Sequence, residues 1–146
     1  MSRIPVSENF FLDEFVPPEL YNERGARCAS LVDIRVFMFA QWLRDKTGKP
    51  VTINNWWKGG QYHESGRRMP NTRTGAKWSQ HKDGRAGDYK VEGMTPKEVH
   101  ELILANEAEL IEKQWVTTLE DLRDTPTWTH ADCRYTGLDK IQIVRA

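Results

Sequence analysis

The stretch Ser79–Tyr89, SQHKDGRAGDY, places His81 seven residues before Asp88, with Gly84 between them. Glycine adopts turn conformations without a steric penalty, so the chain can fold back here and bring both side chains to one point. Ala86 and Gly87 are expected to keep the backbone beside Asp88 thin, which leaves room for an ion and its substrate. Imidazole nitrogen and carboxylate oxygen both bind zinc, and a catalytic zinc site needs three protein ligands and an open position.

The other three histidines of the chain are the candidates for the third ligand. We expect His100 to lie on the polar, solvated side of a helix. His63 lies in a long loop and is a second candidate. His130 is best placed, because it alternates with Trp128 and Asp132 along a predicted strand, so that the three side chains share one face. The spacing therefore predicts one Zn²⁺ ion held by His81, Asp88 and His130.

Two motifs, SxHxxGxAxD (residues 79–88) and WxH (residues 128–130), resemble those of the zinc D-Ala-D-Ala carboxypeptidase family. That family includes the vancomycin-resistance D,D-dipeptidases, bacteriophage L-alanyl-D-glutamate endolysins and the zinc domain of hedgehog signalling proteins. The resemblance covers most of the chain from the segment Ser7–Phe15, which is similar to the start of many short members. It implies a mononuclear zinc peptidase that cuts the stem peptides of bacterial peptidoglycan.

The resemblance also implies an arginine that holds the carboxylate or carbonyl of the substrate, in a segment before the first zinc ligand. Arg68, in the segment SGRR, fits the expected spacing better than Arg67. A guanidinium fork is well suited to a carboxylate. We assign Ser79 and Trp128 to substrate binding as well. Four tryptophans flank the site in sequence and either line a groove for peptide or sugar or pack in the core: Trp56, Trp57, Trp78 and Trp128.

The general base is the point at which this chain departs from the family. The better-known branches carry an acidic residue three positions before the last histidine ligand, where this chain has Thr127, which cannot act as a base. Hedgehog-like members place an acid six positions before that histidine, so the resemblance favours Asp124. Asp132 is the second choice, although it could instead orient a metal ligand. Glu120 and Asp121 are the other carboxylates nearby.

The rest of the pattern predicts an α+β fold, with a small, mostly antiparallel sheet flanked by helices, similar to the hedgehog and D,D-peptidase fold. Ser30 is the expected cap of the first helix, whereas Thr95, Pro96 and Glu98 form the start of the second. The whole chain, 1–146, is expected to form one domain. The predicted elements are an N-terminal arm (1–27), helices (30–47 and 96–113), strands (51–55, 87–91, 114–119, 128–133 and 140–144) and a polar loop (58–80).

The chain has 146 residues, with 21 Lys and Arg against 21 Asp and Glu, so its formal net charge is zero. Zero net charge argues against bulk electrostatic binding to nucleic acid or to an anionic membrane. The sequence has no secretory signal and no run of the ~20 apolar residues that span a membrane. We therefore expect a cytoplasmic monomer with Cys28 and Cys133 reduced, a single disulfide being the alternative.

The charges are unevenly distributed along the chain. Residues 58–90 contain eight basic and three acidic residues, a net charge of +5, whereas residues 98–124 contain two basic and eight acidic residues, a net charge of −6. The basic excess lies in the loop that leads to the predicted zinc site, where it would attract an anionic stem peptide.

The resemblance therefore implies a zinc metallopeptidase that hydrolyses peptidoglycan stem peptides, as a D,D-carboxypeptidase or as an endolysin-type endopeptidase. The expected setting is a phage-related hydrolase that acts on the cell wall after release from the host cytoplasm. Because Thr127 occupies the usual position of the base, a catalytically silent zinc-binding module of a phage particle is the alternative. A metal-free globular domain is the third hypothesis.

Overall fold

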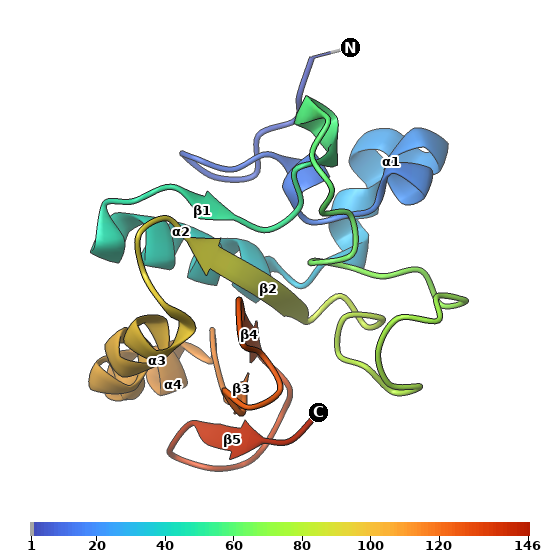
Figure 1. Cartoon of the computed structure of the whole chain (residues 1–146). Coiled ribbons are helices and arrows are strands. Elements are labelled where there is room, and N and C mark those ends of the chain that lie inside the picture. The colour runs from blue at the N-terminus through green and yellow to red at the C-terminus, as the bar shows by residue number, and fades with distance from the viewer. Residues whose placement is uncertain (1) are drawn as a thin grey trace.

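The computed structural model describes residues 2–146, which form a five-stranded sheet with four α-helices (Figure 1). The strand order is β1-β2-β4-β3-β5, and neighbours pair antiparallel except for β3 and β5, which are parallel. The predicted α+β class is therefore confirmed, and the sheet is mixed. The strands are β1 (Val51–Thr52), β2 (Ala86–Val91), β3 (Thr118–Glu120), β4 (Thr129–Asp132) and β5 (Gln142–Val144).

The helices are α1 (Pro18–Arg24), α2 (Ile34–Thr47), α3 (Pro96–Ala105) and α4 (Glu107–Lys113). The core lies between α2 and one face of the sheet, where the Phe39 ring packs edge-on against Tyr89 of β2 with 5.0 Å between centroids. Helices α3 and α4 lie together beside the sheet, away from the long loop that precedes β2 (Figure 1). On the opposite face of the sheet, Asp88 of β2 and its partner His130 of β4 are buried as well.

The first predicted helix begins later than expected. Its N-cap is Asp33, whose carboxylate accepts a hydrogen bond from the Arg35 backbone N–H at 3.0 Å. The Ser30 hydroxyl donates instead to the carbonyl of Arg27, inside a 3₁₀ segment that precedes α2. The assignment of Ser30 as the cap is therefore wrong. The predicted end is confirmed, because Gly48 adopts the left-handed conformation with φ of 66°.

The capping box at the start of the second predicted helix is confirmed, since Thr95 and Glu98 bond to each other's backbone. The helix does not continue to residue 113 without a break. It is interrupted at Asn106, whose side chain donates to the carbonyl of Leu102, so that α3 and α4 are separate. The expectation that His100 is solvated is wrong, because this side chain is only 4% exposed on the inner face of α3.

The N-terminal arm packs against the loop that supports the site. Phe15 is fully buried and contacts the Phe37 ring of α2 edge-on. The carbonyl of Phe15 accepts the Arg67 N–H at 2.8 Å. Gly66 lies directly against the same carbonyl, where any side chain would collide with backbone atoms. The arm thus fixes the start of the loop segment that contributes residues 66–68 to the site.

No helix within residues 2–146 has both the length and the apolar character that a membrane crossing requires. Cys28 and Cys133 are both buried and free, which agrees with the prediction of two thiols and excludes the alternative of a disulfide between them.

Candidate metal centre

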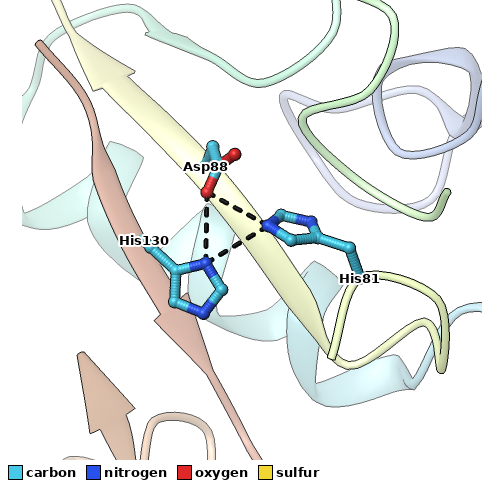
Figure 2. A group of neighbouring side chains, drawn as sticks. All are labelled: His81, Asp88 and His130. Carbon is cyan, nitrogen blue, oxygen red and sulfur yellow. Dashed lines mark hydrogen bonds and ion pairs between the residues drawn. The ribbon is translucent and has the colours of Figure 1, made fainter. Parts of the chain in front are cut away.

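Three buried side chains point toward one another on the face of the sheet that is turned away from α2 (Figure 2). Asp88 on β2 and His130 on β4 are directly opposite partners in the strand register, and His81 reaches them from the turn before β2. The Nε2 atom of His81, the Oδ1 atom of Asp88 and the Nδ1 atom of His130 are 3.2 Å from one another in all three pairs. This group could hold a metal ion.

The turn before β2 aims His81 at the other two ligands. Gly84 has φ of 71° and lies against the carbonyl of Leu31, so both its conformation and its surroundings require glycine. The Nδ1–H group of His81 donates to the carbonyl of Gly66 at 2.8 Å. Because a carbonyl oxygen only accepts, this bond fixes the tautomer and leaves the Nε2 lone pair free to bind a metal.

Asp132 and Arg134 hold the second imidazole in place. The Nε2–H group of His130 donates to the Asp132 carboxylate at 2.8 Å. Arg134 in turn donates to both oxygens of Asp132, at 2.8 and 2.6 Å. The Nδ1 atom of His130 is therefore left facing the other two ligands. A carboxylate that accepts from a metal-binding imidazole is the usual outer partner of such a ligand.

The pKa values of the group show strong coupling between its charges. Burial disfavours the charged form of His130, but its bonds to Asp132 and Asp88 outweigh burial and raise its pKa to about 9. Burial acts against ionisation of Asp88 as well, yet the two histidines hold the pKa of Asp88 well below its ordinary value. In the absence of a metal, these shifts favour a protonated His130 beside an ionised Asp88.

The three side chains lie in a cleft of about 400 Å³, a volume typical of small-molecule sites. One wall is formed by residues 74–76 and 78–80 of the long loop and the other by Trp128, Arg134 and residues 144–146. Glu120 of β3 also lies in this cleft, with its Oε1 atom 3.5 Å from the Nδ1 atom of His130.

The strand register explains why Glu120 lies close to the candidate ligands Asp88 and His130. Leu119 is opposite Ala131, so the next position on the same strand, Glu120, is opposite His130. Asp88, His130 and Glu120 therefore form one row across three strands, on the same face of the sheet. In the sequence, Glu120 is ten positions before His130, and it follows Asp124 and Asp132 among the candidate bases.

Asp124, the base favoured by the sequence, is engaged at the rim of the cleft. Its carboxylate accepts from the Nε and Nη2 atoms of Arg145, at 2.8 and 3.0 Å, and from the backbone N–H of Ala146 at 2.9 Å. These bonds lower the pKa of Asp124. Asp121 is paired with Arg123 in a similar way. Of these carboxylates, the structure brings Glu120 to the histidine ligands.

Arg68 lies beside the candidate ligand Asp88. Its Nη2 atom is 3.2 Å from the Oδ2 atom of Asp88, and its Nε–H group donates to the carbonyl of Glu64 at 2.8 Å. Its Nη1 atom lies against Gly75 in the wall of the cleft. The neighbouring Arg67 turns away and donates to the carbonyl of Leu31.

The remaining predicted residues divide between the cleft and the core. Ser79, Trp78 and Trp128 line the cleft, whereas Trp56 and Trp57 pack edge-on against the buried ring of Tyr21. The Ser79 hydroxyl accepts the backbone N–H of His81 at 3.2 Å, so this serine also supports the turn. His63 lies in a separate hollow beside Glu64 and Met69, away from the metal group.

The role expected of Gly87 is wrong. It is on the face of β2 opposite to Asp88, because neighbouring residues of a strand point to opposite sides. A Cβ atom at this position would lie 2.6 Å from the Tyr89 ring. Gly87 therefore makes room for a core tyrosine and not for an ion.

Comparisons of the chain with models of known protein families, with curated proteins and with solved structures find no significant match. The function must therefore be argued from the geometry of the cleft itself.

Proposed function

We propose that this protein is a zinc-dependent peptidase that hydrolyses the stem peptides of bacterial peptidoglycan. The observation that carries the proposal is the triangle of His81, Asp88 and His130, with 3.2 Å between each pair of donor atoms. Tetrahedral zinc with bonds of about 2.0–2.1 Å separates its ligand atoms by about 3.3 Å. Two imidazoles and one carboxylate also match the donor set of zinc, with a position left for water.

Zinc bound here would polarise the scissile carbonyl and lower the pKa of water in the cleft. Glu120 is the residue to which we assign the proton transfers, because its carboxylate faces the same point as the ligand atoms. In this role Glu120 accepts a proton from the attacking water and then donates it to the leaving amine. Asp132 stays bonded to His130 and Arg134, so its part is to orient a ligand.

Arg68 is suited to binding the carboxylate of the substrate. Its Nη2 atom is fixed by Asp88 and its Nε atom by the carbonyl of Glu64, so that the guanidinium is held in one orientation. The Nη1 atom lies at the wall of the cleft beside Gly75. A guanidinium held in this way binds a carboxylate with little loss of side-chain entropy. The net charge of +5 over residues 58–90 would attract the same anionic substrate.

Digestion of purified peptidoglycan by zinc-loaded protein tests the proposal, with mass spectrometry of the soluble fragments. We expect shortened stem peptides that are absent after chelation and absent with the His130→Ala variant. Release of single D-alanine would identify a carboxypeptidase, whereas cleavage within the stem would identify an endopeptidase. If the protein binds one zinc ion per chain but releases no fragment, the peptidase proposal fails and a silent zinc-binding module is the better description.

A further inference from the structure

Trp78 is 82% exposed although it lines the metal cleft. Its one aromatic or cation–π neighbour within residues 2–146 is the ammonium group of the adjacent Lys77, 5.2 Å from the centroid of the ring. The other tryptophans near the loop, Trp56 and Trp57, pack against the core. An indole that is left in water adds little to the stability of its own fold, because its large apolar surface is not buried. The face of Trp78 is therefore available to a ligand.

The wall around Trp78 is polar. Its neighbours in the cleft, Thr74, Ser79 and Gln80, carry hydroxyl and amide groups, and the others are the small residues Gly75 and Ala76. The Oε1 atom of Gln80 is buried and has no hydrogen-bond partner. This wall thus presents one flat apolar surface beside the hydroxyl groups of Thr74 and Ser79.

A pyranose ring has the complementary chemistry, with C–H groups on one face and hydroxyl groups around its edge. The hydroxyl groups of a sugar can bond to the Thr74 and Ser79 hydroxyl groups beside the indole, whereas an apolar peptide side chain would make no use of them. We propose that Trp78 stacks on a sugar of the substrate, so that this protein recognises stem peptides that are still attached to a glycan. The inference rests on the proposed function, since it concerns the substrate of the same cleft.

The test compares two substrates, an N-acetylmuramyl-linked stem peptide and the same peptide with an acetyl group in place of the sugar. Trp78→Ala is expected to raise the KM for the sugar-linked peptide about tenfold, which corresponds to a stacking contact of ordinary strength. The kcat for that substrate and the KM for the free peptide are expected to stay within about twofold of the wild type. Trp78→Phe, which retains an aromatic face, should recover part of the loss.

Tyr135→Ala is the matched control, because Tyr135 is 87% exposed but does not line the cleft. This variant should behave as the wild type with both substrates. Equal effects of Trp78→Ala on the two substrates, or no effect on either, would overturn the sugar contact.

Binding separates this inference from the peptidase proposal. If zinc-loaded wild type cleaves neither substrate, the peptidase proposal fails, and calorimetric titration with the sugar-linked peptide decides the inference alone. Tighter binding of the sugar-linked peptide than of the free peptide, lost in Trp78→Ala, supports it. Equal binding of the two peptides, or none, refutes it.

Discussion

Replacing two carboxylates of the cleft one at a time, as Glu120→Gln and Asp124→Asn, separates the two candidates for the general base. Both changes remove a charge and preserve the shape of the side chain. Glu120 has its Oε1 atom 3.5 Å from the Nδ1 atom of His130, in the same row of the sheet as the ligands. Asp124 is bonded three times to Arg145 and Ala146 at the rim. The structure therefore predicts that Glu120→Gln mainly lowers kcat, whereas Asp124→Asn mainly raises KM.

General acid–base catalysis contributes about 10² to 10⁴ in rate, which is about 3–5 kcal/mol of the barrier. We expect Glu120→Gln to lower kcat by a factor in this range while KM changes less than about threefold. We expect Asp124→Asn to leave kcat within about threefold of the wild type. Its KM should rise severalfold, because the bonds that hold residues 145 and 146 in the wall of the cleft are weakened.

Steady-state kinetics on a soluble stem peptide, with zinc content measured for each variant, provides the assay. Each variant must hold one zinc ion per chain, so that a lost ligand is not mistaken for a lost base. The charge-reversed pair Asp124→Arg with Arg145→Asp should recover the KM if the rim contact alone matters. A large fall of kcat in Asp124→Asn, together with near-normal turnover by Glu120→Gln, would refute the assignment made from the strand register.

Three further changes test the surroundings of the ligands. Asp132→Asn should weaken zinc affinity about 10- to 100-fold in a chelator competition, because His130 loses its ionic outer partner; unchanged affinity would argue against that role. Gly75→Ala places a Cβ atom 2.6 Å from the Nη1 atom of Arg68, at a position with φ of 77°. Because this contact displaces the guanidinium, the KM should rise, while the thermal midpoint of unfolding falls only slightly. An unchanged KM would show that the position of Arg68 is unimportant. The folded pKa of His130 without metal, about 9, is above its ordinary 6.5, so its stabilising effect is complete below pH 6.5 and is lost as the pH rises through 9. In urea denaturation, the free energy of unfolding of metal-free protein should fall as the pH rises. That of zinc-saturated protein should rise with pH, because protons compete with the metal for His130. The same pH trend in both forms would contradict a site that protons and zinc share.

That His81, Asp88 and His130 lie together could be predicted from the sequence, because their positions depend on local rules. Alternation along a strand places His130 and Asp132 on one face, and the turn at Gly84 returns the chain toward Asp88. The start of the first predicted helix was predicted less well. Both Ser30 and Asp33 are good caps, and only the packing of the preceding 3₁₀ segment selects Asp33.

His100 and Gly87 show a different limit of the sequence. His100 is buried because its side of α3 faces the rest of the fold. The sequence pattern within α3 does not show which elements pack against that side. The sequence also does not show which neighbour in space requires a glycine at a given position. Gly87 is next to a proposed ligand, but its neighbour in space is the ring of Tyr89.

Glu120 was ranked low because distance along the chain is a poor guide between strands. The residues that connect β3 to β4, 121–128, can vary in number without changing which residues face each other. What determines the distance from the carboxylate to the imidazole is the register, in which Leu119 is opposite Ala131 and the next pair is Glu120 with His130. An acid three or six positions before a histidine reaches it only if the connection has a matching length. Counting from the paired strand, and not from the histidine, would have identified Glu120 from the sequence once the pairing of β3 with β4 was assumed.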